Sequence, residues 1–305
     1  MVSFGPRPQP PGEPAQILSG GPVAAARLSD LHIERRPLRT DDHIVILVSA
    51  GQGTHALDFV TYACRPGTLL WGRPGQVHQF GGQSGFDATV LAFSPGILPV
   101  LPELATLRQL VEDPFAATCW QPAGEDEEAI VAEIAQIGVD RVRYGSTPFG
   151  VNLLAHSVAV LLMRMAALAP AGPRGPADLL VGLLRAELER EVTHRRVEDY
   201  ADTLRCSVRT LTRACLAVTG RSAKQLIDER VALEAKRVLA TSELPVSDVG
   251  RMLGFDEPTN FGRFFARETG QSPGAFRAML EHTPTPRGVP FQRSALPGRL
   301  TPRSA

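Results

Sequence analysis

Two short segments near the end of the chain combine side chains that proteins use to bind DNA. Arginine binds guanine and phosphate, asparagine binds adenine, and threonine can bind bases or phosphates. The side chains in question are Arg209, Thr212, Arg213, Thr259, Asn260 and Arg263. The 305-residue chain has 32 basic and 32 acidic residues, so its net charge favours no class of partner. A nucleic-acid surface would therefore have to be local.

The two segments belong to an internal repeat. Residues 197–222 align with residues 246–272, so that Arg213 is matched by Arg263 and Gly220 by Gly270. Two copies are too few for a solenoid, and a pair of related modules is the better interpretation.

Each copy has the pattern of a helix-turn-helix. In the second copy Gly254 is placed to end the first helix, and Pro258 fits the first turn of the next helix. In the first copy Ser207 is placed to cap the second helix. Two helices joined by such a tight turn can place the second helix in the DNA major groove.

The apolar residues of each second helix predict which face is buried. Phe261, Phe264 and Phe265 share one helical face, and Leu211 and Cys215 form the buried side of the first copy. The alternative to DNA binding is a pair of solvated helical faces, but the matched arginines favour DNA binding.

The segment between the copies predicts one rigid helix. Ser222 and Gln225 form a capping box, and an apolar stripe follows at helical spacing. The stripe consists of Ile227, Val231, Ala235 and Val238. A helix of this length spans roughly 30 Å, which would hold both recognition helices toward one side of the DNA.

The first third of the chain predicts short antiparallel strands. The strand candidates are residues 43–48, 54–64, 68–72, 76–80 and 88–93, separated by glycine and proline turn signals. Strands this short and evenly spaced indicate a β-barrel or jelly roll.

Helical periodicity begins at about residue 125. Ile130, Ile134 and Ile137 mark one helix, and Val151 to Leu168 mark a second after a break at residues 145–148. The second helix is apolar around much of its circumference, so core packing and a dimer interface both remain open. Its most apolar run, Val158–Ala169, is too short to span a bilayer.

These patterns predict an α+β multidomain chain. We expect a flexible arm at residues 1–16, a cupin-like β-barrel with a helical hairpin at 17–169, and a linker at 170–177. An all-α double helix-turn-helix domain at 178–282 and a disordered tail at 283–305 would follow. The N-terminus lacks the apolar run of a signal peptide, and the four cysteines lack metal or disulfide spacing, so we expect the cytoplasm and no membrane.

The last third of the chain resembles the AraC/XylS family of bacterial transcription regulators. The resemblance lies in SVRTLTRACLAVTGRSAKQLIDERVALEAKRVLATSELPVSDVGRMLGFDEPTNFGRFFARETGQSPGAFR. It implies double-stranded DNA as a partner, and RNA polymerase if the protein is an activator. The apolar helices at 125–169 favour a homodimer formed through them. By position, the residues that would contact DNA are Arg205, Ser207, Arg209, Thr212, Arg213, Pro258, Thr259, Asn260, Arg263 and Arg267.

The N-terminal part is similar to the cupin-type sensor domain of this family. AGQGTH and CRPGTLLWGRPGQVHQF carry the similarity, but the metal-binding HxH and Glu of the first cupin motif are absent. Because these metal ligands are absent, we predict no metal and no cofactor. We expect a small-molecule effector that is less polar than a sugar. Candidate contacts are His43, His55, Tyr62, Trp71, Arg73, His78 and Phe80.

A ligand-controlled regulator has three alternatives: a cupin oxygenase, an alkyl-accepting repair protein and a DNA-binding protein controlled by a protein partner. A cupin oxygenase requires a metal triad, and an alkyl-accepting repair protein requires a zinc-held cysteine, and neither pattern is present. We therefore predict no catalytic residue. The sequence does not separate control by a small ligand from control by a protein partner.

Overall fold

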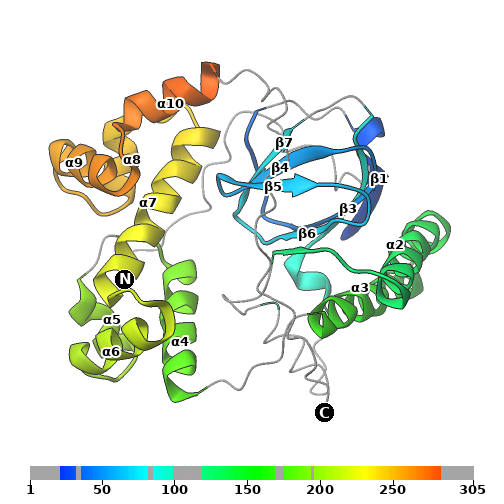
Figure 1. The fold of residues 1–305 in the computed structure, drawn as a ribbon, viewed down its shortest axis with the longest axis horizontal. Helices are drawn as coiled ribbons and strands as arrows, with labels where there is room; N and C mark the ends of the chain where they lie inside the picture. The colour runs from blue at the N-terminus through cyan, green and yellow to red at the C-terminus, as the bar shows by residue number, and fades with distance from the viewer. Residues whose placement is uncertain are drawn as a thin grey trace, which may run out of the picture.

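The computed structural model describes residues 21–31, 36–81, 85–98, 111, 118–168, 175–193 and 196–282. Figure 1 shows two facing β-sheets and a helical pair in the N-terminal half, and a helical C-terminal part beside them. The predicted α+β arrangement is therefore confirmed. The arm and tail predicted at residues 1–16 and 283–305 lie outside the described residues.

The N-terminal half is built from two antiparallel sheets. The first has the order β1 (Val23–Arg27), β8 (Asp87–Phe93), β3 (His43–Ala50), β6 (Leu69–Gly72) and β9 (Cys119–Trp120). The second has the order β2 (Leu38–Arg39), β7 (Val77–Gly81), β4 (Gly53–Leu57) and β5 (Val60–Cys64). Short 3-10 helices occupy Leu28–Asp30 and Pro95–Ile97. Strands β1, β2 and β9 were not among the individual strands predicted.

Strand β3 shows why the first sheet has continuous apolar strands. Val45 and Leu47 pack with the helical pair, whereas Ile44 and Ile46 pack in the space between the sheets. Successive side chains of a strand point to opposite faces, so a strand covered on both faces is apolar at every position.

The predicted helical hairpin consists of α2 (Glu125–Tyr144) and α3 (Pro148–Ala167), packed on the first sheet. Thr147 caps α3, since its side chain accepts a hydrogen bond from the Gly150 N–H. Among the described helices, α3 alone has the length and apolar composition of a membrane span. Leu154, Val158 and Leu161 are nevertheless buried in the core, as in the central helix of a globular domain.

Seven helices form the C-terminal part and share one core. They are α4 (Pro176–Arg190), α5 (Val197–Thr203), α6 (Val208–Thr219), α7 (Ala223–Thr241), α8 (Val246–Met252), α9 (Pro258–Thr269) and α10 (Pro273–His282). Helix α4 begins at Pro176, which is two residues before the end of the linker expected at 170–177. Proline at the first position of a helix is favourable, and the Asp178 carboxylate accepts from the Gly175 N–H there.

One predicted strand is wrong. Residues 54–64 form the hairpin β4–β5 rather than a single strand, with the turn at Asp58 and Phe59. Both turn residues have positive φ, 49° and 66°, which usually requires glycine or asparagine at least at the second position. No such signal is present in the sequence, because long-range contacts hold this turn. The Asp58 N–H donates to the Val77 carbonyl at 2.8 Å, and the Asp58 carboxylate accepts from the Val77 N–H at 3.0 Å.

Candidate nucleic-acid interface and ligand-binding interior

The first helix-turn-helix consists of α5, a four-residue turn and α6. Ser207 caps α6 as predicted, because its hydroxyl accepts from the Thr210 N–H at 3.0 Å. Arg205 in the turn has a φ of 52°. Leu211 and Cys215 are completely buried on the inner face of α6, which packs on α4 and α7. The predicted inner face is confirmed.

The second helix-turn-helix consists of α8, a turn at Gly254 and α9. Gly254 has a φ of 86°, and α9 begins at Pro258. Phe261, Phe264 and Phe265 are buried, as the sequence predicts. A Cβ atom on Gly250 would lie 2.9 Å from the Phe261 Cβ, so glycine is required where α8 crosses α9.

The polar residues predicted to contact DNA lie on the outer faces of both modules. Thr212 is partly buried; all the others are exposed. Arg209, Arg213 and Arg263 form no ion pair with any other described residue. The exposed residues are Arg205, Ser207, Arg209, Arg213, Pro258, Thr259, Asn260, Arg263 and Arg267.

Arg267 differs from the other arginines because it has acidic partners. Its Nη2 atom lies 3.1 Å from the Asp228 carboxylate on α7, and its Nε atom lies 2.7 Å from Glu268. The guanidinium also lies 5.4 Å from the centre of the Phe264 ring. These contacts hold α9 against α7, so a phosphate contact by Arg267 would have to replace them.

Helix α7 joins the two modules. The predicted capping box is confirmed: the Ser222 N–H donates to Gln225 Oε1 at 2.8 Å, and the Gln225 N–H donates to Ser222 Oγ at 3.3 Å. The predicted apolar stripe is buried, but three charged side chains of α7 are buried as well. These are Asp228, Glu234 and Arg237. In Figure 1 the pairs α5–α6 and α8–α9 lie near opposite ends of α7, on the side away from the sheets.

The seven ligand candidates do not form one site. His43 and Trp71 belong to the first sheet, whose outer face is covered by α2 and α3, and Arg73 directly follows its strand β6. The Trp71 indole donates to His43 Nδ1 at 3.2 Å, and the Arg73 guanidinium lies 4.4 Å from the Trp71 ring centre. This group therefore packs the outer face of the sheet.

A second group faces the space between the sheets. His55 Nε2 and His78 Nδ1 lie 3.2 Å apart, and the Phe80 ring meets the His55 ring edge-on at 4.6 Å. Tyr62 packs on the same inter-sheet cluster, and a Cβ on Gly72 would collide with the His78 ring. His55 Nδ1 and His78 Nε2 are buried and have no partner among the described residues.

The three buried histidines are uncharged at neutral pH. Burial, with the nearby positive charge of Arg73, lowers the pKa of His43 to about 4. Burial also lowers the pKa of His78 to about 4, and burial together with His78 lowers the pKa of His55 well below its usual value. The inter-sheet group therefore offers polar but neutral side chains to a ligand. No group of three or more His, Cys, Asp or Glu in the described residues could hold a metal ion.

Two protein-family models match the chain. Residues 24–125 match the AraC-like ligand binding domain, and residues 200–279 match a helix-turn-helix domain. The first match contains both sheets except Val23, the first residue of β1. The second contains α5 from Tyr200 onward, α6, α7, α8 and α9.

The chain is also similar to curated regulators over most of its length. It is 27% identical to the arabinose operon regulatory protein of Salmonella typhimurium, over 88% of this chain and 94% of that protein. It is 25% identical to the transcriptional activator RhaS of Citrobacter koseri, over 78% and 85%. Among solved structures, ToxT from Vibrio cholerae is 12% identical, with 86% and 98% coverage and a TM-score of 0.45.

Proposed function

The chain is a DNA-binding transcription regulator of the AraC family with an AraC-like ligand-binding domain in its N-terminal part, and we propose that α6 and α9 are its two DNA-reading helices. Each helix enters a successive segment of the major groove. We further propose that the ligand-binding domain ends near residue 169 and that the DNA-binding domain starts at Pro176, where α4 begins.

The exposure of the matched arginines is the observation that supports this assignment. Arg213 and Arg263 stand on the outer faces of α6 and α9 and have no acidic partner within the part of the chain that the structure describes, so their charge is available to phosphates or guanines. By contrast, Arg190, Arg230 and Arg267 of the same domain each form an ion pair with an acidic side chain. Arg209 and Thr212 complete the first contact set, and Thr259 and Asn260 the second.

The test begins with a DNA site selected by the full chain from random duplexes. Arg213→Ala and Arg263→Ala should each weaken binding to that site roughly tenfold or more, since one arginine–guanine contact is worth about 1–3 kcal/mol. Each variant should lose discrimination at a different part of the site.

Arg190→Ala is the matched control, because Arg190 is equally exposed but pairs with Glu187 on α4. It should bind the selected site like the unmodified chain. Binding unchanged in Arg213→Ala and Arg263→Ala would refute the assigned contacts, while failure to select any site would refute DNA reading by this chain.

We propose that two copies associate through α2 and α3. Exposed apolar or small residues recur on one face of α2 at Val131, Ala135 and Val142, with the half-buried Gly138 among them, and Phe149 at the start of α3 is also exposed. Val142→Glu should shift the sedimentation coefficient toward that of the monomer, whereas Arg143→Glu beside it should not. Equal sedimentation of both variants would exclude this surface.

We propose that the effector binds between the sheets, against His55, Tyr62, His78 and Phe80, while His43, Trp71 and Arg73 have structural roles. A thermal-shift screen of weakly polar small molecules tests this. A stabilising compound should lose its effect in Tyr62→Ala and retain it in Arg73→Gln. The opposite pattern would place the effector on the other group, and no stabilising compound would favour control by a protein partner.

A further inference from the structure

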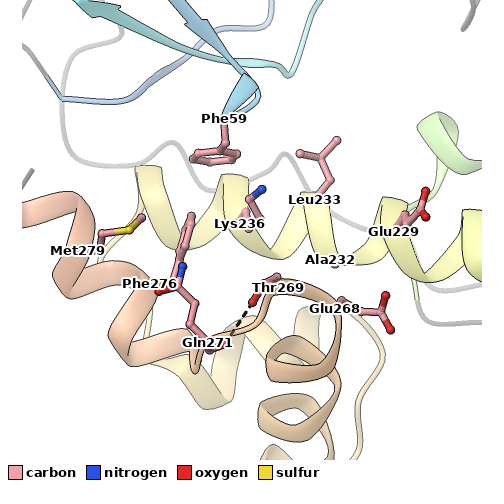
Figure 2. Close-up of a pocket in the computed structure, with 10 residues that line it drawn as sticks. All are labelled: Phe59, Glu229, Ala232, Leu233, Lys236, Glu268, Thr269, Gln271, Phe276 and Met279. Atoms are coloured by element: carbon pink, nitrogen blue, oxygen red, sulfur yellow. Dashed lines mark hydrogen bonds between the residues drawn. The ribbon is translucent and has the colours of Figure 1, made fainter. Parts of the chain in front are cut away.

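The β4–β5 turn of the ligand-binding domain touches the DNA-binding domain. Asp58 and Phe59 form the tip of this hairpin, and Figure 2 shows Phe59 projecting from it toward α7 and α10. Neither family model accounts for this contact, because it joins the two matched regions.

Asp58 forms a buried ion pair with α7. Arg237 donates to the two Asp58 carboxylate oxygens from Nε at 2.8 Å and from Nη2 at 2.6 Å, a bidentate pair. The Arg237 side chain is only 4% exposed and that of Asp58 10%. Gln76 Nε2 and the Val77 N–H donate to the same carboxylate at 2.7 and 3.0 Å. Asp58 is therefore held from the ligand-binding domain and from α7 at once.

Burial alone would raise the pKa of Asp58, but the hydrogen bonds and charge of Arg237, with those of Val77 and Gln76, hold it below its usual value. The carboxylate is thus charged at neutral pH. Removing one member of a charged pair this buried lowers the stability of the fold, because the other charge is left buried without a partner.

Phe59 is the outermost member of a row of aromatic rings. Its ring meets the Phe276 ring of α10 edge-on at 5.4 Å, and Phe276 lies 5.7 Å from Phe265 of α9. The row continues inside the second module from Phe265 to Phe261 at 6.0 Å, and from Phe261 to Phe255 at 5.4 Å. All these separations fall in the range of favourable aromatic pairs. Phe59 therefore extends the core on which α9 rests.

The first module has no comparable connection to the turn. Leu211 and Cys215 belong to the core that both modules share, but the row of rings does not reach α5 or α6 in the described residues. Ionic contacts from Arg237 reach α4 at Glu189, directly at 4.0 Å and by way of Glu234 and Arg230, whose Nη2 lies 2.8 Å from Glu189. The Glu189 side chain is 54% exposed. Solvent weakens an ion pair that is this exposed.

The backbone of the turn has an unfavourable conformation at Phe59, and this conformation points the ring toward α7 and α10. Phe59 has a φ of 66°, a region that phenylalanine rarely occupies and glycine occupies freely. Such a conformation persists only where surrounding contacts hold it. Here those contacts include Phe276 and the ammonium group of Lys236, which lies 4.6 Å from the centre of the Phe59 ring.

We propose that the Asp58–Phe59 turn is a latch that couples the ligand-binding domain specifically to the second recognition helix. This inference rests on the proposed reading of DNA by α9. Closing the latch orders α9 and α10 through the aromatic row, and opening it loosens the second module more than the first, which the row does not reach in the described residues.

Hydrogen exchange of the full chain tests the coupling without requiring DNA. In Phe59→Gly the turn keeps a favourable backbone but loses its ring, and peptides from α9 and α10 should exchange about threefold faster or more. Peptides from α5 and α6 should be unchanged. Asp58→Asn, which suits the same turn and removes only the charge, should have a similar but smaller effect. Val60→Thr, at an exposed neighbouring position, is the control and should change neither module.

Binding to the DNA site selected by the full chain tests the functional consequence. Phe59→Gly should reduce discrimination at the base pairs assigned to Arg263, and should leave discrimination at those assigned to Arg213 intact.

The outcomes separate this inference from the proposed function. Equal exchange changes in both modules, or none, would overturn the latch even if DNA reading holds. If hydrogen exchange in α9 is faster but discrimination at the base pairs assigned to Arg263 is unchanged, the turn contacts the second module without controlling DNA reading. That result also overturns the inference. Absence of any selected site would instead remove the proposed function.

Discussion

Ala201 on α5 and Leu211 on α6 occupy the positions that Gly250 on α8 and Phe261 on α9 occupy in the second module. All four are buried. Where the facing residue is the larger phenylalanine, the crossing position has lost its Cβ atom, and the pair of changes keeps the helices in contact. At this crossing the two modules hold a similar total side-chain volume with different residues.

The two modules also differ in the residues that form their turns and cap their second helices. The first module has a strained Arg205 and a serine cap at Ser207, whereas the second has Gly254 and begins α9 at Pro258 without a side-chain cap. The first module thus accepts strain in its turn and gains a capping hydrogen bond. The second avoids the strain and is ordered by its aromatic core and by the ligand-binding domain.

The largest effect is expected from exchanging the crossing residues. Gly250→Ala should lower the free energy of unfolding of the C-terminal part by about 2 kcal/mol, because the new Cβ overpacks against Phe261. Ala201→Gly should cost only about 0.5–1 kcal/mol, the usual penalty of glycine in a helix. Urea unfolding followed by helical circular dichroism measures both.

A rescue sharpens this test. Adding Phe261→Leu to Gly250→Ala recreates the residue pair of the first module and should recover part of the lost stability. If Gly250→Ala unfolds at the same urea concentration as the unmodified chain, the close crossing does not limit the second module.

A smaller effect of opposite sign is expected in the turns. Arg205→Gly should stabilise the chain by about 1 kcal/mol, since glycine adopts positive φ without strain. Affinity for DNA should fall in the same variant if the side chain binds phosphate. Gly254→Ala should destabilise by a similar amount. Thermal unfolding and a binding titration give the two readouts, and destabilisation by Arg205→Gly would contradict the assignment of strain.

The smallest effect concerns the caps. Ser207→Ala should cost about 0.5 kcal/mol, at the low end for a helix cap because the site is exposed. Glu257→Ala, at the matching start of α9, should be neutral because that side chain makes no capping hydrogen bond. Equal losses in both variants would show that the modules do not differ at their caps.

Local patterns made much of the C-terminal part predictable. Gly254, Pro258 and Ser207 act within one turn of the backbone, and the phenylalanines of α9 follow helical periodicity. The same logic failed for residues 54–64, where a crude alternation suggested a strand and no turn residue marked the hairpin. It also missed the ion pair of Arg267, because the carboxylate of Asp228 is 39 residues away on α7.

The candidate ligand site shows the same limit. His43 and His78 are both buried histidines in strands, yet His43 lies on the outer face of the first sheet and His78 lies between the two sheets. Which face a side chain takes depends on the register between strands and on what covers each sheet. Neither is encoded in the residue itself.

Periodicity, capping and repetition act over short stretches of chain, so residue order was enough to predict the doubled helix-turn-helix, the outward arginines and the rigid helix between them. The turn at Asp58 and Phe59, the burial of Arg237 beside it and its contact with the second module depend on residues far apart in the chain. The physical reason is that positive backbone angles and a buried ion pair cost free energy locally, and only partners distant in the chain can offset that cost.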